Sequence, residues 1–199
     1  MSDALPVIVG ITGASGVSIA KQTIDMLLES STPTIVSASS AARIVWQEEM
    51  DESFGSALER WRDSDLFQYY PPQQITAPVA SGSFPTRGMA IVPCSMATLA
   101  AIAHGMSDNL IRRCADVCMK ERRPLTLMTR ETPLSAIHLE NMAKLANLGV
   151  KIMPPDPPFY LKLEYVEQIA EYFAHRVVSA LGVTDTLPEH LQYRGPGNL

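Results

Sequence analysis

A glycine-rich turn near the start of the chain has the composition of a ligand-binding loop. The stretch VIVGITGASGVSIA, residues 7–20, runs from an apolar segment into three glycines spaced three residues apart. Glycine lets a ligand approach the backbone closely, and the N–H groups that begin a following helix favour an anion. Thr12 and Ser15 add hydroxyl groups to the same turn. The stretch therefore predicts a site for an anion or a flavin edge, with a tight turn as the alternative explanation of the glycines.

The same turn does not fit a nicotinamide dinucleotide. Its spacing is G-x-x-G-x-x-G, whereas the dinucleotide fingerprint is G-x-G-x-x-G. The second predicted strand, Thr34–Ser37, continues into Ala38 and Ser39 without an Asp or Glu that could bind a ribose diol. Both differences argue against NAD.

Charged residues recur on one face of a predicted helix at Asp108–Lys120. Arg113, Asp116 and Lys120 occupy positions i, i+3 and i+7 and therefore share a face, opposite an apolar side. Arg can bind a phosphate through two donors, and Lys binds it as a point charge. This face is either part of a phosphate site or an ordinary solvated surface.

A second charged group follows the predicted buried strand Pro124–Thr129. Arg130 and Glu131 come directly after this strand, and Pro133 favours an extended residue before it. Ligands of doubly wound sheets bind beyond the carboxyl ends of the strands. A guanidinium beside a carboxylate there predicts a phosphate site in which the carboxylate shares a proton with the phosphate. A structural ion pair is the alternative.

Apolar runs alternate with amphipathic segments along the chain. Unbroken apolar runs are typical of parallel strands covered on both faces, and their alternation with helices predicts a doubly wound α/β fold. Asp51–Ser83 is the least regular stretch, and Tyr69–Pro72 has the composition of a surface loop. The expected strands are Val7–Thr12, Thr34–Ser37, Met89–Pro93, Pro124–Thr129 and Val150–Met153, and the expected helices are Val17–Leu28, Ala41–Glu49, Met96–His104, Asp108–Lys120, Ser135–Leu148 and Val166–Leu181.

The composition limits the class of protein. The chain has 199 residues, 46% hydrophobic residues and a formal net charge of −5, which fits one globular domain and offers no basic surface for nucleic acid. No apolar run is long enough to span a membrane, and the N-terminus lacks a signal core. The three cysteines argue against a disulfide framework and favour a reducing, cytoplasmic location. Cys114 and Cys118 are expected to pack in the core and not to bind a metal.

Several runs of the sequence together resemble one protein family. These runs are GITGASG, ASGSF, VPCSMATLAAIAHGMSDNLIRRCADVCMKERRPLTLMTRETPL and IHLENMAKLANLGVKIMPP. With them the chain resembles the flavin prenyltransferases, the UbiX-like proteins that were formerly called aromatic-acid or phenylacrylic-acid decarboxylase subunits. The resemblance implies a flavodoxin-like (Rossmann-type) single domain, residues 1–183. It also implies that the tail, residues 184–199, caps the active site or packs on a neighbouring subunit.

The resemblance further implies a reaction. Members of this family bind reduced FMN and join a dimethylallyl group to its N5 and C6 atoms, with dimethylallyl monophosphate or diphosphate as the donor. The product, prenylated FMN, is the cofactor of a separate UbiD-type decarboxylase. The family needs no metal for this transfer and assembles as a dodecamer built of trimers, so we expect a homododecamer here.

The matching motifs carry the family's site residues onto this chain. Ser15, Glu49 and Glu131 are the expected catalytic residues. Residues expected to bind the flavin are Gly13, Ser15, Ser39, Ser95, Met96, Thr98 and, at its phosphate, Arg113. Residues expected to hold the dimethylallyl phosphate are Lys120, Arg130, Glu131, Tyr160 and Arg176.

A few positions depend on the exact alignment with the family. A slip of one residue would select Glu48 in place of Glu49. Ser40 stands where many relatives carry a larger, often basic residue. Tyr193 is the candidate for the aromatic residue that caps the site, and His138 is expected to be structural.

Two other functions stay as alternatives. One is an FMN-dependent cysteine decarboxylase of the same superfamily, which oxidises a thiol-bearing substrate. That class needs a His early in the helix after the second strand, and Ala41–Glu49 has none. The other is a non-catalytic FMN carrier, which would not need Lys120, Arg130 and Arg176 around a second anion.

Overall fold

Six parallel strands form one sheet in the order β3-β2-β1-β4-β5-β6. The computed structural model describes residues 4–193 and 195. The inner strands are buried along their whole length, as their unbroken apolar sequences predicted, and the two edge strands are short. The strands are β1 (Val7–Ile11), β2 (Thr34–Ala38), β3 (Phe67–Tyr69), β4 (Gly88–Cys94), β5 (Leu125–Thr129) and β6 (Lys151–Ile152). The predicted doubly wound parallel sheet is confirmed.

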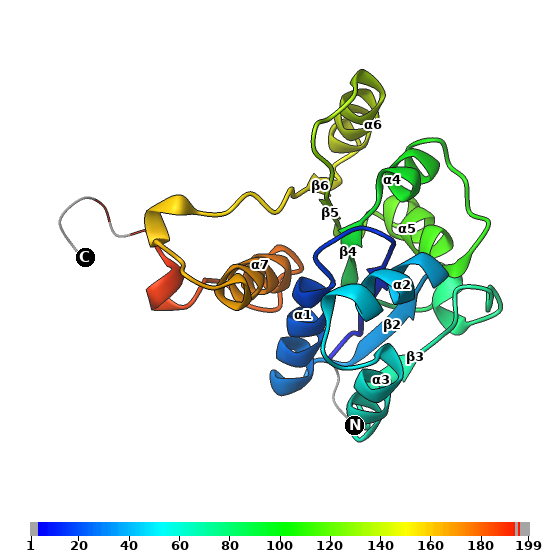
Figure 1. Cartoon of the computed structure of the whole chain (residues 1–199). Helices are drawn as coiled ribbons and strands as arrows, with labels where there is room; N and C mark the ends of the chain where they lie inside the picture. Colours follow the sequence, from blue (N-terminus) through cyan, green and yellow to red (C-terminus); the bar gives the residue numbers. More distant parts are fainter. Residues whose placement is uncertain (1–3, 194, 196–199) are drawn as a thin grey trace.

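Helices cover both faces of this sheet (Figure 1). One hydrophobic cluster is completed by α1 (Val17–Glu29), α2 (Ser40–Glu49), α3 (Phe54–Arg62) and α7 (Val166–Ala180). The cluster on the opposite face is completed by α4 (Met96–Ala103), α5 (Leu110–Lys120) and α6 (Ala136–Asn147). None of the helices among the described residues is long and apolar enough to cross a membrane.

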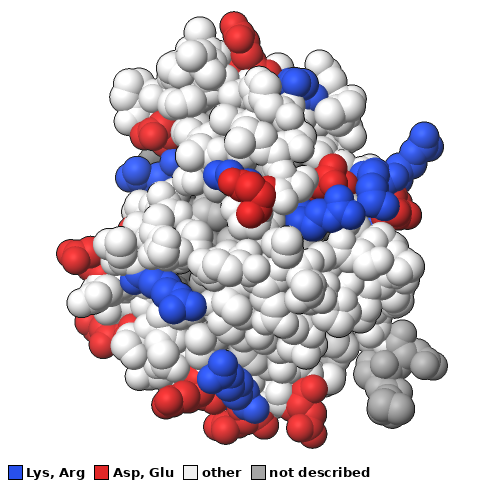
Figure 2. All heavy atoms as spheres, turned by 90° about the vertical axis from the view of Figure 1, so that its right-hand side faces the viewer, with Lys and Arg blue, Asp and Glu red and all other residues white. Residues whose placement is uncertain are grey.

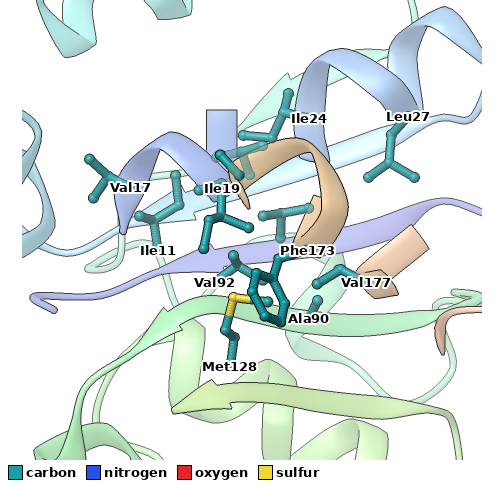
Figure 3. Close-up of a cluster of buried hydrophobic side chains, with 14 of the residues drawn as sticks. Ile11, Val17, Ile19, Ile24, Leu27, Ala90, Val92, Met128, Phe173 and Val177 are labelled. Atoms are coloured by element: carbon teal, nitrogen blue, oxygen red, sulfur yellow. The ribbon is translucent and has the colours of Figure 1, made fainter. Parts of the chain in front are cut away.

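Side chains of the sheet, α1 and α7 form a core on one face of the sheet. Figure 3 shows Ile19 of α1 and Phe173 of α7 packed over Val92 and Met128 of the sheet. Burying a side chain of this size stabilises the fold by about 1.5–3 kcal/mol. The strand order reverses between β1 and β4, and in such folds the crevice at this reversal is the usual ligand site.

Five helices begin at a small polar residue that satisfies a free backbone donor. In each case the side chain accepts a hydrogen bond from the backbone N–H three residues later, which stabilises the helix by about 1 kcal/mol. The capping residues are Ser39, Ser53, Ser95, Asn109 and Ser135. Two of them, Ser39 and Ser95, are also residues that the resemblance places at the flavin.

The stretch Asp51–Ser83, which the sequence predicted to be irregular, contains α3 and β3. Tyr69, expected in a surface loop, is the last residue of β3. The reason is an aromatic cluster that is not local in sequence: Trp46 of α2 packs edge-on against Trp61 of α3, with ring centroids 6.0 Å apart. Both rings are buried, so tertiary packing overrides the weak local pattern of this stretch.

A network around Asp25 ties α3 to α1. The Asp25 carboxylate accepts hydrogen bonds from Trp61 Nε1 at 2.6 Å, Lys21 Nζ at 2.9 Å and Arg60 Nη1 at 3.0 Å. Burial acts to raise the pKa of Asp25, but the hydrogen bonds from Trp61, Lys21 and Arg60 outweigh it, and the pKa is lowered. The ionised carboxylate therefore contributes to stability.

Part of the chain between β6 and α7 extends away from the sheet. Figure 1 shows α6 standing beyond β6 and a segment that runs outward before α7 returns to pack on α1. This outward segment leads into the short helix η2 (Phe159–Leu161). Lys151 Nζ donates to Ala180 O at 2.6 Å, so a cation offsets the partial negative charge at the end of α7.

Candidate functional site

A pocket of about 410 Å³ lies beyond the carboxyl ends of β1, β4 and β5. Its walls come from the turn after β1, from α2, from the start of α4 and from the turn after β5. This is the end of the sheet that the fold predicts for a ligand. The lining residues are Gly13, Ala14, Ser15, Ile44, Val45, Glu48, Glu49, Ser95, Met96, Arg130 and Glu131.

The pocket brings together many of the residues predicted from the sequence. Among the described residues, the lining contains all three expected catalytic residues and several of the expected ligand-binding residues. Ser39 and Thr98 lie just outside it, as the cap of α2 and as the partner of Ser95. Ile44 and Val45 were missed, although they share a helix face with Glu48 and Glu49 and this spacing could have revealed them.

Glu49 occupies the anion position at the start of α1. Its carboxylate accepts hydrogen bonds from the backbone N–H of Gly16 at 2.9 Å and of Val17 at 3.1 Å. The sequence predicted that these donors would face a ligand anion, and in the structure the anion is a side chain of the same protein. Glu48 lines the same pocket, and its carboxylate has no hydrogen bond within the described part of the chain.

Gly13 has a packing role in addition to its predicted place at the flavin. The sequence predicted that glycine in this turn lets a ligand approach the backbone closely. In the structure a Cβ at Gly13 would lie 2.5 Å from the Cβ of Ala41, the second residue of α2. Gly13 therefore permits the turn after β1 to contact α2, and it lines the pocket at the same time.

Thr12 links the two turns that frame the pocket floor. Its buried hydroxyl donates to Pro93 O at 2.9 Å and accepts from the backbone N–H of Ser95 at 2.8 Å. Ser95 in turn caps α4: its hydroxyl accepts from the N–H of Thr98 and donates to the Thr98 hydroxyl. The sequence showed that Thr12 adds a hydroxyl to the glycine-rich turn. Its bridge to Ser95 could not be predicted, because the two residues are 83 positions apart.

Arg130 and Glu131 are exposed at the rim of the pocket. The backbone N–H of Arg130 donates to Cys94 O at 3.3 Å, which fixes the turn after β5 against the end of β4. The Glu131 carboxylate accepts from the N–H of Thr132 at 3.0 Å. Within the described residues the two side chains form no ion pair, so both charges are available to a ligand.

The cations of α5 face another surface. Arg113 Nε donates to Ala80 O at 3.0 Å, and Arg113 Nη1 pairs with Asp116 at 2.7 Å. Lys120 Nζ contacts Glu121, and this hydrogen bond lowers the pKa of Glu121. Among the described residues, Arg113 and Lys120 are absent from the pocket lining. The surface that Figure 2 presents has scattered charges and no continuous basic patch.

A glycine that the sequence argument did not single out lies beside Lys120. A Cβ atom added at Gly82 would collide with Lys120 Nζ and Glu121 Oε1. Because Arg113 also donates to Ala80, the segment Ala80–Gly82 contacts two cations of α5, Arg113 and Lys120. The motif ASGSF contained this segment, but its contact with α5 was visible only in the fold.

The remaining expected residues form a third group on the C-terminal part of the chain. The Tyr160 ring packs edge-on against Tyr193 with centroids 5.3 Å apart. Loss of solvent contact and then a hydrogen bond with Tyr172 raise the pKa of Tyr160, while Arg176 opposes this change. Figure 1 shows the yellow segment that contains η2 and the helix α5 on opposite sides of the sheet. One chain thus presents the expected residues on three separate surfaces.

The buried cysteines and His138 have structural positions. Burial raises the pKa of Cys94, Cys114 and Cys118 to about 12, so these thiols stay protonated and unreactive at neutral pH. Packing of Cys114 and Cys118 in the core is confirmed. His138 Nδ1 accepts from Ser135 N at 3.2 Å, which completes a capping box at the start of α6. The described residues contain no group of three His, Cys, Asp or Glu that could hold a metal.

Comparisons with known proteins agree with this geometry. The model of the Flavoprotein family matches residues 1–177. The chain is 42% identical over 183 residues to flavin prenyltransferase UbiX of Methanocaldococcus jannaschii, covering 92% of this chain and 96% of that protein. It is 38% identical to flavin prenyltransferase UbiX of Pseudomonas aeruginosa, covering 94% and 95% of the two chains. The chain belongs to the flavin prenyltransferase family.

Solved structures of this flavin prenyltransferase family have the same fold. The crystal structure of AnUbiX in complex with FMN and dimethylallyl pyrophosphate matches with a TM-score of 0.87 and 36% identity over 98% of both chains. A dodecameric FMN-dependent UbiX-like decarboxylase from Escherichia coli O157:H7 matches with a TM-score of 0.88 and 37% identity, covering 96% of this chain and all of that one. The flavodoxin-like fold implied by the resemblance is confirmed.

The rival class, the cysteine decarboxylases, shares only the fold with this prenyltransferase family member. The FMN-dependent cysteine decarboxylase TvaF matches with a TM-score of 0.58 and 16% identity. The peptidyl-cysteine decarboxylase EpiD matches with a TM-score of 0.55 and 18% identity. Likeness at this level carries no information on activity.

Proposed function

We propose that this protein joins a dimethylallyl group from a dimethylallyl phosphate to the N5 and C6 atoms of reduced FMN and releases phosphate and prenylated FMN. The observation that carries the proposal is one pocket whose lining contains Ser15, Glu49 and Ser95 together with Arg130 and Glu131. Residues suited to a flavin therefore adjoin residues suited to a second, anionic substrate. A relative with 36% identity was crystallised with FMN and dimethylallyl pyrophosphate together, which supports the pairing.

The pocket fits a flavin in size and chemistry. Its volume of about 410 Å³ lies within the range of small-molecule sites. Ile44, Val45 and Met96 provide apolar walls for a planar ring, and the hydroxyls of Ser15 and Ser95 can hydrogen-bond its polar edge. Reduced FMN is the acceptor substrate and supplies the electron-rich ring that the dimethylallyl group joins.

The residues of this chain act on the departing phosphate and on protons. When the allylic C–O bond breaks, its electron pair leaves with the phosphate, so cations beside that phosphate lower the barrier. Arg130 lies at the pocket rim and can take this role, and Glu131 beside it can share a proton with the phosphate. Ring closure at C6 releases one proton, for which the bound phosphate is a suitable base.

The other predicted phosphate ligands would reach the pocket from neighbouring copies. Arg113, Lys120, Tyr160 and Arg176 lie outside the pocket of their own chain, and assembly can bring their surfaces to the pocket of another subunit. We propose a dodecamer of trimers. A dodecameric relative supports this assembly, as do large apolar side chains that a single chain leaves exposed. These exposed side chains include Ile44, Ile137, Leu139, Leu148 and Phe159.

The product and location follow from the same proposal. Prenylated FMN would pass to a UbiD-type decarboxylase, as the family resemblance implies. Three free, buried thiols fit a reducing, cytoplasmic location. The donor is proposed as dimethylallyl monophosphate or diphosphate.

The deciding experiment is a single incubation followed by mass spectrometry. The purified protein is mixed anaerobically with reduced FMN and either dimethylallyl monophosphate or dimethylallyl diphosphate. The mass of the released flavin is then measured. We expect a mass gain of one dimethylallyl group with at least one donor. Bound FMN that keeps its mass with both donors would overturn the proposal. Reduction of oxidised FMN by a cysteinyl peptide would then indicate a cysteine decarboxylase, and no change with either substrate would indicate a carrier.

A further inference from the structure

Thr12 is a buried threonine whose hydroxyl connects the turn after β1 to the turn between β4 and α4. It follows β1 directly and is 3% exposed, and it does not line the pocket. Its hydroxyl joins two atoms of the β4–α4 turn, Pro93 O at 2.9 Å and Ser95 N at 2.8 Å. Its own backbone N–H also donates to Pro93 O, at 3.2 Å.

The direction of these hydrogen bonds is fixed by chemistry. The Ser95 backbone N–H can only donate, so the Thr12 oxygen accepts from it. The carbonyl of Pro93 can only accept, so the Thr12 proton points toward that carbonyl. A side chain that must accept and donate at once can be serine or threonine, but not valine, which has the same shape without the hydroxyl.

Thr12 lies just beyond the last residues at which β1 and β4 are paired in the sheet. The pairing of β1 with β4 runs from Val7 opposite Gly88 to Gly10 opposite Ile91. Beyond this point the Thr12 backbone N–H still donates to Pro93 O at 3.2 Å, and the Thr12 hydroxyl adds the bond that reaches Ser95, directly before α4. One wall of the pocket, Gly13–Ser15, follows Thr12 directly, and the facing wall contains Ser95 and Met96.

We propose that Thr12 is a positioning residue for the flavin: its hydroxyl sets the distance between the turn after β1 and the start of α4. The inference rests on the proposed flavin site, because it concerns the spacing of that site's two walls. Loss of the hydroxyl would leave the part-buried Ser95 N–H without its partner, while the Pro93 carbonyl would keep only the 3.2 Å bond from the Thr12 backbone N–H. The Ser95–Met96 turn would then shift to regain hydrogen bonds, and the flavin would meet a wider pocket.

The sheet offers a matched control in another buried threonine. Thr126 of β5 is fully buried, and its hydroxyl has no hydrogen-bond partner within the described residues. Thr126→Val makes the same change of atoms as Thr12→Val but breaks no hydrogen bond. Thr12→Ser keeps the hydroxyl and removes only a methyl group, so it should restore the bridge.

The experiment compares FMN binding by the unsubstituted protein and the variants Thr12→Val, Thr12→Ser and Thr126→Val. Binding is followed by fluorescence titration and by the absorption spectrum of the bound flavin, below the melting temperature of every variant. We expect Thr12→Val to weaken binding at least about tenfold and to shift the spectrum toward that of free FMN. Thr12→Ser and Thr126→Val should stay within about threefold of the unsubstituted protein and keep its spectrum.

The outcomes separate this inference from the proposed function. If the unsubstituted protein neither binds nor prenylates FMN, the proposed function fails. If it binds FMN and Thr12→Val binds equally well with the same spectrum, or if Thr126→Val weakens binding as strongly, the role of Thr12 is refuted. Should Thr12→Val fail to fold, hydrogen exchange of the unsubstituted protein decides: the Ser95 amide should exchange slowly, and rapid exchange would refute the bridge.

Discussion

The carboxylate of Glu49, the last residue of α2, accepts a 2.9 Å hydrogen bond from the backbone N–H of Gly16, directly before α1. The contact fixes one wall of the pocket to the glycine-rich turn. It also holds the carboxyl group that the family resemblance assigns to catalysis at a defined place beside Ser15. Glu48 lies in the same pocket without such a contact, so the two neighbouring glutamates can be separated by experiment.

Glu49→Gln should slow product formation at least roughly tenfold, about 1.4 kcal/mol of barrier, with little change in FMN affinity. Both backbone N–H groups donate to the same carboxylate oxygen, so a glutamine oxygen in its place can still accept from them, but the side chain no longer exchanges a proton. Single-turnover prenylation measured by rapid quench tests this. Glu48→Gln removes the same charge from the same pocket and serves as the control. A larger loss in the Glu48 variant would assign the role to Glu48.

Gly13→Ala should destabilise the fold, by about 1–3 kcal/mol, because its Cβ would lie 2.5 Å from that of Ala41. Urea unfolding measures this change. Gly55→Ala in α3 is the control: its Cβ would meet Ser53 Oγ at 3.6 Å, and alanine stabilises a helix by about 0.5–1 kcal/mol relative to glycine. Equal stability of the two variants would show that the turn after β1 can move away from α2.

Arg113→Ala and Lys120→Ala should give different defects. The two residues are two turns apart on α5, roughly 10 Å along the axis, which suits two phosphates better than one. We expect Arg113→Ala to weaken FMN binding and Lys120→Ala to retain FMN without prenylating it. FMN titration and flavin mass spectrometry measure the two properties. If both variants lose FMN affinity and turnover to the same extent, they serve a single anion site.

Subunit mixing tests whether neighbouring copies complete the pocket. Arg130 lines the pocket of its own chain, whereas Lys120 does not. The Arg130→Ala variant and the Lys120→Ala variant should each be inactive alone. An oligomer assembled from a mixture of the two variant chains should regain part of the activity. Some pockets then receive both unsubstituted residues, from different subunits. A mixed assembly as inactive as its parents would place both residues in a site within one chain.

Asp25 should make the fold sensitive to acid. Its pKa is lowered in the folded state from the ordinary value of 3.8, so its stabilising effect is complete above that value. The effect is lost as the pH falls through the folded-state pKa. Asp25→Asn should therefore destabilise the protein at pH 7, by about 1–2 kcal/mol, and the difference should shrink as the pH falls below 3.8. Urea unfolding across this range measures it, and a constant difference would argue against the linkage.

The four inner strands could be predicted from the sequence, because each is marked by an apolar run of neighbouring residues. The strands β1, β2, β4 and β5 are unbroken apolar runs next to turn residues, and each is buried as expected. The short edge strand β3 was missed, since three half-exposed residues carry no clear pattern. α3 was missed as well, because what holds it in place is the distant pair Trp46 and Asp25.

The sequence predicted which kinds of residue form the site, but not how these residues are arranged in space. Motifs predicted Arg130 and Glu131 beyond a strand end, and both line the pocket. The contact between Glu49 and Gly16 joins positions 33 residues apart, and helical periodicity does not report it. The separation of Lys120 from Arg130 depends on which way the charged face of α5 points, which is decided by the packing of its apolar side.

The two edge strands of the sheet limit how copies of this protein can associate. β3 has three residues and β6 has two, so neither edge exposes enough unpaired backbone to capture a strand from another molecule. Aggregation through strand addition is thereby disfavoured even at high protein concentration. Association is left to side chains on the helices and loops, where single substitutions can tune its strength and specificity without touching the sheet.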